Sequence, residues 1–504
     1  MRGPRPLVAL LLFLPLSAAG TLWSCGGGNP TTGTTGASAG GSPPEAGDAP
    51  SLDEFQAPPD TGPTVRCKLD NGTDPVALCI QKVVLSAEHH AAFDAVHGVA
   101  QSWDAATLLP DTDASHVVLH DARDDAAYAA SVARYHQSAQ TYGDDEITGQ
   151  LDADLVALVP RLEAELTPPP AAYAGELYLD LRHASGGLRY LNRDDLAKGV
   201  DTLAEAYGRA VFDTFFVSVP SGDGGAGDGG ADAVLGTPAA GGGTAYAPAD
   251  VATGALALLD LAVRHATDDP THAASWQGAA AAAFDHLHLR ARDTVTGMYF
   301  RALVTSADPG HDALAAAPPG GPPADALLSD VQARIALALV RAQALVDQNP
   351  VALHGLASYP FEQRAEQAIA ALDAPSKSLW DATATGYMEG WVPSTATLLT
   401  DKPTRANALL FAAIHRASLM GNTPFASRTK ALRPLLVDRS TPHAGLLTVV
   451  PDQTGYFRAV PAGFDFSSDG GADAGADPRA RSYFSSAIAD AIEGLDEQWY
   501  GAPK

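Results

Sequence analysis

Basic side chains are scarce in this chain. Its 504 residues include 32 lysines and arginines against 59 aspartates and glutamates, which gives a net charge of −27 and a pI near 4.7. Such a surface repels polyanions, and no basic patch interrupts the acidity. The composition therefore argues against nucleic acid as a partner.

Cysteine is also scarce, with only Cys25, Cys67 and Cys79 present. Neither of the last two has a histidine or a second cysteine at metal-ligand spacing, so a zinc site is not expected there. If Cys25 is modified, as argued below, an even pair remains. In an oxidising compartment a Cys67–Cys79 disulfide is then the simple inference.

The signatures of common cofactor chemistry are missing. There is no Gly-x-Ser-x-Gly elbow, phosphate-binding loop with lysine, His-Glu-x-x-His or Cys-x-x-Cys-His. The Asp/Gly-rich run at Gly224–Asp232 misses the repeat of calcium-binding β-helices by one residue. His116 and His120 would share a face in a helix or in a strand, so their spacing alone does not define a zinc site. The sequence predicts no metal and no cofactor.

Residues 1–24 have the form of an export signal. Arg2 and Arg5 give a positive start, and Leu7–Leu16 is an apolar stretch too short to span a bilayer. Thr21–Cys25 then resembles the cleavage site of a bacterial lipoprotein signal peptide, which implies cleavage before Cys25 and lipid chains on its thiol and new amine. The alternative is an ordinary signal peptide with an incidental cysteine.

The lipoprotein resemblance implies a location in the cell envelope. Gly26, rather than aspartate, follows the cysteine, which by resemblance to bacterial sorting rules favours the outer membrane. The predicted partner through the lipid is therefore a membrane, and no later stretch is apolar enough to be a transmembrane helix.

The chain divides by composition into a tether and a folded domain. Residues 25–62 are rich in Gly, Ser, Thr and Pro, so we expect a disordered tether, followed by a helical domain over 63–504. Three further segments of the same character are expected to be disordered loops: 221–243, 306–323 and 467–477.

Helical periodicity dominates the domain, and period-two alternation is scarce. The segments that show it best are Asp250–His265, Asp330–Asp347, Thr404–Met420 and Arg481–Leu495. In the second of these, apolar residues form one face while Arg334 and Arg341 lie on another. Asp250 is a plausible N-cap of the first. The predicted fold class is all-α.

One turn motif recurs after these helices, at Asp293–Tyr299, Asp381–Met388 and Asp452–Phe457. With the helices, it resembles the α/α toroid of helical hairpins found in six-hairpin glycosidases and in N-acylglucosamine and cellobiose 2-epimerases. The resemblance covers about Tyr173–Tyr500 and lacks the second glycine of those families' turn. It implies a site in a central cleft, and a saccharide or other envelope polymer as ligand. No catalytic motif of those families aligns.

Glycoside hydrolysis needs two carboxylates, one protonated and one ionised. Asp381 and Glu389 are the first candidate pair, because an aromatic ring beside a carboxylate can stack on a sugar. The rings near them are Trp380, Tyr387 and Trp391. Packing between helices is the other role open to these rings.

Asp194 and Asp195 form a second candidate pair, because one bacterial α-mannanase family of this architecture uses adjacent aspartates. The same two residues also fit the start of a helix. Histidines could act as acid and base as in the epimerases, but none of them stands in a matching motif: His183, His265, His286, His288 and His415. Saccharide processing and a non-catalytic scaffold or interaction role both stay open, and no feature indicates an oligomeric state.

Overall fold

The computed structural model describes most of the chain beyond residue 75. The described ranges are 76–104, 109–113, 117–142, 147–166, 173–219, 232–239, 242–306, 312–319, 321–373, 378–382, 385–419, 425–437, 447–450, 453–456, 459–460 and 482–500. The predicted signal peptide, the tether, Cys25 and Cys67 lie outside them.

Helices make up most of the described chain. The α-helices are α1 (Val76–Ala91), α2 (Ala122–Tyr142), α3 (Thr148–Glu165), α4 (Ala174–Tyr190), α5 (Asp194–Ala210), α6 (Pro248–Arg264), α7 (Pro270–Arg290), α8 (Ser329–Gln348), α9 (Phe361–Ala371), α10 (Thr404–Leu419), α11 (Ala426–Val437) and α12 (Ser485–Tyr500). A π-helical turn, η2 (Val211–Phe215), and a 3₁₀ turn, η3 (His354–Leu356), accompany them.

The strands are short and lie between the helices. They are β1 (Phe93–Asp94), β2 (Gly98–Val99), β3 (Ser102–Asp104), β4 (Phe216–Val219), β5 (Asp232–Leu235), β6 (Thr237–Pro238), β7 (Thr244–Tyr246), β8 (Leu303–Val304), β9 (Ala313–Leu314), β10 (Leu327–Leu328), β11 (Gly390–Val392), β12 (Thr397–Leu399), β13 (Lys402–Pro403), β14 (Leu447–Val450), β15 (Gln453–Tyr456), β16 (Ala459–Val460) and β17 (Ser482–Phe484). The larger sheets have the orders β10-β11-β12 and β6-β7-β8-β9.

Alternate helices form a closed inner ring. The helices α2, α4, α6, α8, α10 and α12 contact one another in that order, and α12 returns to α2. Inner helices such as α6 and α8 are buried on nearly every side, which explains their apolar sequences. Each inner helix packs against an outer one, namely α3, α5, α7, α9, α11 and α1 in the same order. The described chain is thus an α/α toroid of helical hairpins, which confirms the predicted fold.

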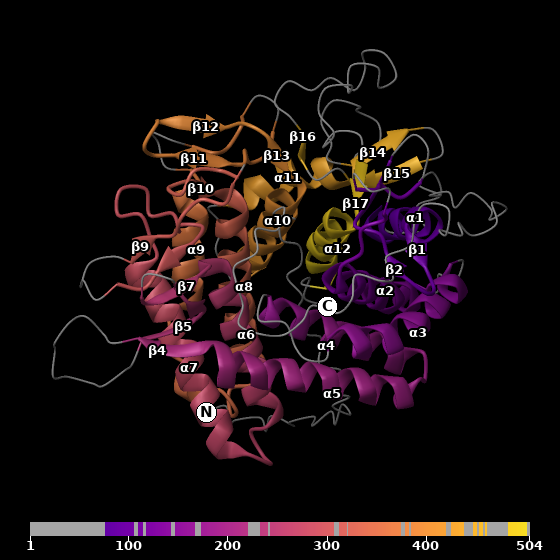
Figure 1. The fold of residues 1–504 in the computed structure, drawn as a ribbon, viewed down its shortest axis with the longest axis horizontal. Coiled ribbons are helices and arrows are strands. Elements are labelled where there is room, and N and C mark those ends of the chain that lie inside the picture. The colour runs from indigo at the N-terminus through magenta and orange to yellow at the C-terminus, as the bar shows by residue number, and fades with distance from the viewer. Residues whose placement is uncertain are drawn as a thin grey trace, which may run out of the picture.

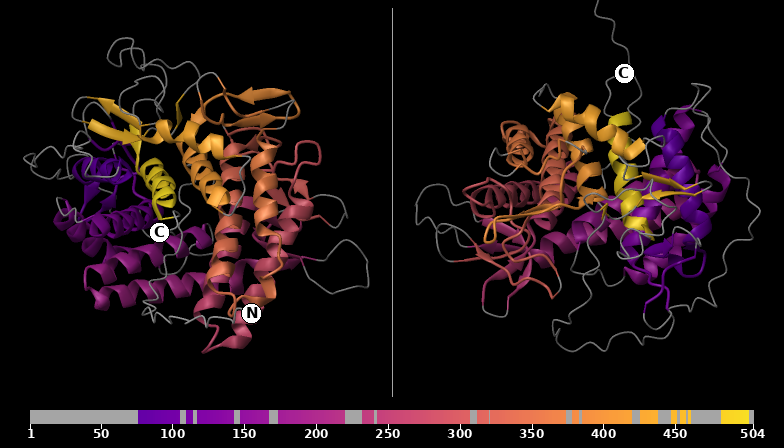
Figure 2. Two further views of the ribbon diagram at one scale, coloured as in Figure 1. Left: turned by 180° about the vertical axis from the view of Figure 1, so that it is seen from behind. Right: turned by 90° about the horizontal axis from the view of Figure 1, so that it is seen from above.

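The two ends of the described chain close the ring. The last inner helix, α12, lies beside the first outer helix, α1 (Figures 1 and 2). Strand β17 pairs with β3, with Tyr483 opposite Trp103 and their rings 6.0 Å apart. The hydroxyl of Ser485, at the start of α12, donates to the Ala100 carbonyl at 2.6 Å. The early helices α1, α2 and α3 thereby complete the ring.

The predicted helices begin where expected, with two exceptions. The N-cap of α6 is Ala247, and Pro248 takes the first helical position, where its missing N–H costs nothing. The expected Asp250 cap is therefore wrong, and Asp250 lies in the first turn. Helix α12 begins only at Ser485, because residues 482–484 pair with β3.

Two of the three recurring turns share one geometry. The amide of Asp293 donates to the Met298 carbonyl at 2.7 Å, and that of Asp381 to the Gly386 carbonyl at 2.9 Å. Gly297 and Gly386 have φ values of 76° and 107°, which favour glycine. The third motif differs, because its residues 453–456 form β15 in a hairpin with β14.

An amide side chain of the next inner helix holds the residue after each such turn. Gln332, the fourth residue of α8, accepts from the Tyr299 amide at 2.9 Å and donates to its carbonyl at 2.8 Å. Asn407, the fourth residue of α10, does the same to Tyr387 at 2.7 and 3.0 Å. We call this pair of contacts the amide clamp. It ties each extended segment to the helix that follows it.

Parts of two predicted loops are ordered strand. Strand β5 lies within 221–243 because Val234 and Leu235 bury their side chains against α7. Strand β9 lies within 306–323, where the buried Asp312 accepts from Arg290 Nε at 3.0 Å. The segment 467–477 lies outside the described residues.

Among the described helices, none is long and apolar enough to cross a membrane.

Strands β10 to β13 gather over one end of α8 and α10 (Figure 1). That end is the N-terminal one, since β10 leads directly into α8 and β13 into α10.

Candidate functional site

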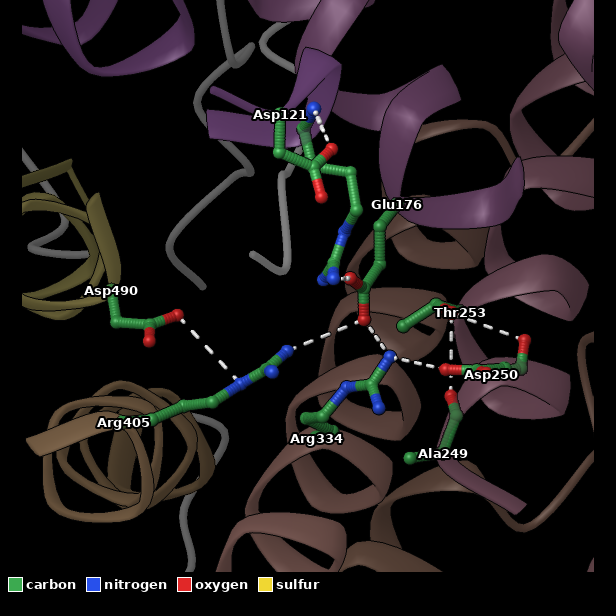
Figure 3. Close-up of polar contacts among 9 residues, drawn as sticks. Asp121, Glu176, Ala249, Asp250, Thr253, Arg334, Arg405 and Asp490 are labelled. Carbon is green, nitrogen blue, oxygen red and sulfur yellow. Dashed lines mark hydrogen bonds and ion pairs between the residues drawn. The ribbon is translucent and has the colours of Figure 1, made fainter. Parts of the chain in front are cut away.

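Charged side chains converge from the N-terminal turns of the six described inner helices (Figure 3). Each of these helices contributes one such residue in its first two turns. We call this set the central cluster: Arg123 (α2), Glu176 (α4), Asp250 (α6), Arg334 (α8), Arg405 (α10) and Asp490 (α12). A helix N-terminus is a region of positive potential, so the helix dipoles act to stabilise negative charge on the three acidic side chains.

Glu176 is the hub of the central cluster. Its side chain is 2% exposed, and its Oε2 accepts from Arg123 Nη2 at 3.1 Å. Its Oε1 accepts from Arg334 Nη2 and lies 3.3 Å from Arg405 Nη2. Three guanidiniums favour the ionised form of a carboxylate.

Two of these arginines also reach a second carboxyl group. Arg334 Nη2 donates to Asp250 Oδ1 at 2.7 Å, and Arg405 Nε lies 3.8 Å from Asp490 Oδ1. Figure 3 shows Arg334 between Glu176 and Asp250, and Arg405 between Glu176 and Asp490. The three carboxyl groups are therefore linked through shared guanidiniums.

The two outlying carboxyl groups hold protons more tightly than usual. Burial raises the pKa of Asp250 to about 6, although Arg123 and Arg405 act to lower it. Burial also raises the pKa of Asp490 well above its ordinary value, against the lowering effect of Arg405. The cluster therefore joins an arginine-paired carboxylate to two carboxyl groups of raised pKa.

A second charged layer lies further along the inner helices. Arg341 and Glu493 form an ion pair of 2.5 Å in which both side chains are 1% exposed. Asp180 follows Glu176 by one turn of α4, and burial raises its pKa to about 7. This layer extends the polar interior beyond the central cluster.

Tyr173 positions Arg123. The guanidinium of Arg123 lies 3.5 Å from the centre of the Tyr173 ring, a cation–π contact. Tyr173 is the N-cap of α4 and has a left-handed φ of 59°, which is uncommon for a side chain of this size. The ring and Glu176 together fix the guanidinium.

The structure brings Asp381 and Glu389 to one short segment before α10. Asp381 Oδ2 lies 3.0 Å from Lys402 Nζ, and the Glu389 amide donates to the Asp401 carbonyl at 2.6 Å. The negative charge of Asp381 is thus paired with a cation that does not belong to the central cluster.

The predicted aromatic residues serve the packing of this region. Trp380 and Tyr387 meet edge to face at 5.0 Å, and the Arg428 guanidinium lies 4.0 Å from the centre of the Trp380 ring. Tyr387 is buried, and Trp391 lies in the central strand of the β10-β11-β12 sheet. Their predicted contact with a sugar stays a hypothesis.

Asp194 and Asp195 lie in the first turn of the outer helix α5. Both are exposed, and Asp195 Oδ1 is 3.4 Å from Arg193 Nε. The structure does not place them among the inner-helix residues of the central cluster.

The histidines are spread over the fold. Burial lowers the pKa of His183 on α4 well below its ordinary value, and that of His288 on α7 to about 4. His286 contacts the Asp312 carboxylate at 2.9 Å, and His265 the Asp268 carboxylate at 3.1 Å. His415 stacks with Phe411 on α10.

Of the two histidines considered as a zinc pair, His120 is described, whereas His116 lies outside the described residues. Burial lowers the pKa of His120 to about 4. Within the described residues, no group of histidine, cysteine and acidic side chains could hold a metal ion.

Sequence reasoning missed most of the central cluster. Arg334 stood out as a charge on a largely apolar helix, and the same signal marks Glu176 and Asp490, each beside buried apolar neighbours. A charged residue near the start of an otherwise apolar helix was therefore the sequence signal that could have identified the cluster. Their convergence depends on ring closure, which links residues more than 300 positions apart.

No protein-family model matches the chain, and no curated protein matches it in sequence. In structure it is similar to the unsaturated glucuronyl hydrolase of Bacillus sp. GL1, responsible for the degradation of glycosaminoglycan, with a TM-score of 0.51 at 11% identity. That match covers 83% of this chain and 93% of the other.

Two further solved structures are similar. One is an unsaturated glucuronyl hydrolase specific for heparin, with a TM-score of 0.51, 10% identity and coverage of 84% and 97% of the two chains. The other is a family 76 glycoside hydrolase from a bovine Bacteroides thetaiotaomicron strain, with a TM-score of 0.52, 10% identity and coverage of 85% and 78%. At such identities these likenesses establish the six-hairpin toroid fold.

Proposed function

We propose that this chain is an envelope-anchored protein that binds a saccharide at the central cluster and hydrolyses a glycosidic bond there. Asp250 is the proposed general acid, and Glu176 is the ionised carboxylate opposite it. The cluster lies where the N-terminal turns of the inner helices meet, at one end of the toroid.

The observation that carries the proposal is the contrast between Asp250 and Glu176. Both accept from the same Nη2 atom of Arg334, so their nearest oxygens lie within about 6 Å, or two hydrogen-bond lengths. Burial raises the pKa of Asp250 to about 6, while Glu176 is paired with three arginines. Two carboxyl groups whose surroundings favour different protonation states are the arrangement that glycoside hydrolysis uses.

The structural neighbours support a saccharide as ligand. The Bacillus and heparin-specific proteins are named as glucuronyl hydrolases, and the Bacteroides protein as a glycoside hydrolase. One fold can host unrelated activities, so the site and not the fold must carry the chemistry.

The test uses the full-length chain, exported by its own signal and purified from membranes in detergent. It is incubated with a panel of bacterial and plant polysaccharides, and newly released reducing ends are measured. We expect Asp250→Asn to lower the rate by about 10²–10⁴-fold, the usual effect of losing a general acid. Asp213→Asn, at an exposed position in η2, is the matched control and should keep the wild-type rate.

The site predicted from the sequence, around Asp381, is the competing assignment. If Asp381→Asn abolishes release while Asp250→Asn does not, the reaction belongs to the segment before α10 and our assignment is wrong. The same experiment with Asp194→Asn tests the pair on α5.

A second candidate function is saccharide binding without cleavage, as a scaffold or interaction protein. One observation favours it: both oxygens of Glu176 are already engaged by arginines. Binding of a polysaccharide with no new reducing ends over long incubation would select this function over hydrolysis.

A further inference from the structure

We propose that Arg405 and Asp490, with Asp180 beyond them, form a subsite that binds hydroxyl groups of an uncharged sugar. This inference rests on the proposed saccharide function and specifies the class of sugar.

Three buried atoms around this point have no hydrogen-bond partner among the residues that the structure describes. They are Asp490 Oδ1, Arg405 Nε and Asp180 Oδ1. The side chains of Asp180 and Asp490 are 3% and 2% exposed. Most buried polar groups in proteins are paired, so each exception needs a cause, such as a ligand or a water.

The distance between Arg405 and Asp490 fits one inserted hydroxyl group. Arg405 Nε lies 3.8 Å from Asp490 Oδ1, which is too far for a direct hydrogen bond. An oxygen about 2.8 Å from each atom would see them at an angle of about 85°, an acceptable geometry for accepting from one and donating to the other. A hydroxyl group does both, because it carries one donor and two acceptor sites. Figure 3 shows the two side chains directed at each other across this gap.

Asp180 offers the second acceptor. It follows Glu176 by four residues on α4, so the two side chains lie on the same face of the helix. The charges that act on it include those of Arg134, Arg341 and Glu493 from other inner helices, which places it in the ring interior. A sugar with several hydroxyl groups can therefore meet acceptors on α4 and α12 at once.

The existing contacts of the arginines favour an uncharged sugar over an anionic one. Each of these arginines already contacts a carboxyl group: Arg123, Arg334 and Arg405 contact Glu176, and Arg341 contacts Glu493. Arg334 and Arg405 also contact Asp250 and Asp490. A uronate or sulfate would have to displace one of these carboxyl groups to pair with a guanidinium, whereas a hydroxyl group needs only the gap between Arg405 and Asp490.

The test compares two probe panels by titration calorimetry on the full-length protein in detergent. One panel holds uncharged gluco-, manno- and galacto-oligosaccharides, and the other holds oligouronates of matched linkage and length. We expect at least one uncharged probe to bind ten-fold or more tightly than its uronate counterpart. Asp490→Asn and Arg405→Gln should each weaken that binding at least ten-fold, and Asp180→Asn about five-fold or more, since each hydrogen bond to a charged group contributes this much. Asp213→Asn should bind as wild type does.

A readout that needs no variant guards against misfolding. Single-deoxy analogues of the best probe should show at least one hydroxyl whose removal weakens binding to the wild-type protein ten-fold. If uronates bind more tightly, the inference is wrong. If saccharide binds but every deoxy analogue and all three variants bind equally well, only an ordered water fills the gap, and the inference fails while the proposed function stands. If no saccharide of either panel binds, both fail.

Discussion

Glu176, on a helix that otherwise carries an apolar face, shows how the toroid accommodates buried charge. Removing one member of a buried ion pair typically destabilises a protein by about 3–5 kcal/mol, because the partner is left uncompensated. Glu176 avoids this cost by sharing three guanidiniums from α2, α8 and α10. Two of those arginines are in turn shared, Arg334 with Asp250 and Arg405 with Asp490, so the three carboxyl groups belong to one network.

The pKa of Asp250 sets the expected pH dependence of hydrolysis. Its raised value of about 6 means that the acid form is the main form only below pH 6. We therefore expect kcat/KM to fall about ten-fold per pH unit above 6, since a general acid must be protonated. Initial rates between pH 4 and 9 measure this. A rate that instead rises through pH 6 would make Asp250 a base and reverse the assigned roles.

Asp180 makes a prediction about stability that does not depend on activity. Its pKa is about 7 in the fold and ordinarily 3.8, so folding favours its protonated form. That stabilisation is complete below pH 3.8 and is lost as pH rises to 7, at about 1.4 kcal/mol per unit. Relative to wild type, Asp180→Asn should therefore gain stability from pH 4 to 7 and level off above 7. Urea unfolding at each pH tests this, and a difference that is constant with pH would exclude it.

At the residue scale, part of the central cluster could be predicted from the sequence. That Arg334 and Arg341 share one face of their helix was predictable, because both interrupt an apolar helix at a spacing of seven residues. The partners of Arg334 were not visible, since Glu176 precedes it by 158 positions and no local pattern pairs them. Asp381 drew attention through its aromatic neighbours, which the structure shows packing on one another and on Arg428.

At the scale of elements, the amide clamp explains how each turn is held to the next inner helix. Gln332 on α8 and Asn407 on α10 occupy the same helical position and grip Tyr299 and Tyr387 by both backbone groups. Asp125, the fourth residue of α2, accepts from the Val99 amide at 2.6 Å in a related way. The Asp-to-Gly turns were predictable from their repeated letters, whereas the clamps were not, because they lie 33 and 20 residues beyond the tyrosines that they hold.

We expect Gln332→Ala to destabilise the fold by about 2–4 kcal/mol, since it leaves the buried N–H and C=O of Tyr299 without their partner. Gln343→Ala on the same helix is the control, because that side chain bonds only to the exposed Asp347 carboxylate. Chemical unfolding of both variants measures the difference. Equal effects of the two substitutions would show that the clamp contributes nothing beyond helix packing.

At the scale of the whole molecule, ring closure determines where the first described residue lies. Helix α1 ends at Ala91, next to strands that lead into α2 and pair with the strand before α12. Its first residue, Val76, is therefore at the opposite end of α1, about 24 Å away at 1.5 Å per residue. The central cluster lies at the N-terminal ends of α2 and α12, so Val76 lies at the end of α1 that is away from the cluster.

The lipid anchor proposed at Cys25 makes a prediction about where the protein is found. The prediction is that Cys25→Ser releases the protein from the membrane fraction, since the substitution removes the residue proposed to carry the lipid and none of the described helices could replace it as a span. The measurement is immunoblotting of membrane and soluble fractions after expression in a bacterial host, with mass spectrometry of the N-terminal peptide to detect the acyl chains. Asp213→Asn, at an exposed position in η2, serves as the control and should stay in the membrane fraction. Retention of Cys25→Ser in membranes, or an unmodified Cys25 in the wild-type peptide, would contradict lipid anchoring while leaving the toroid and its central cluster unaffected.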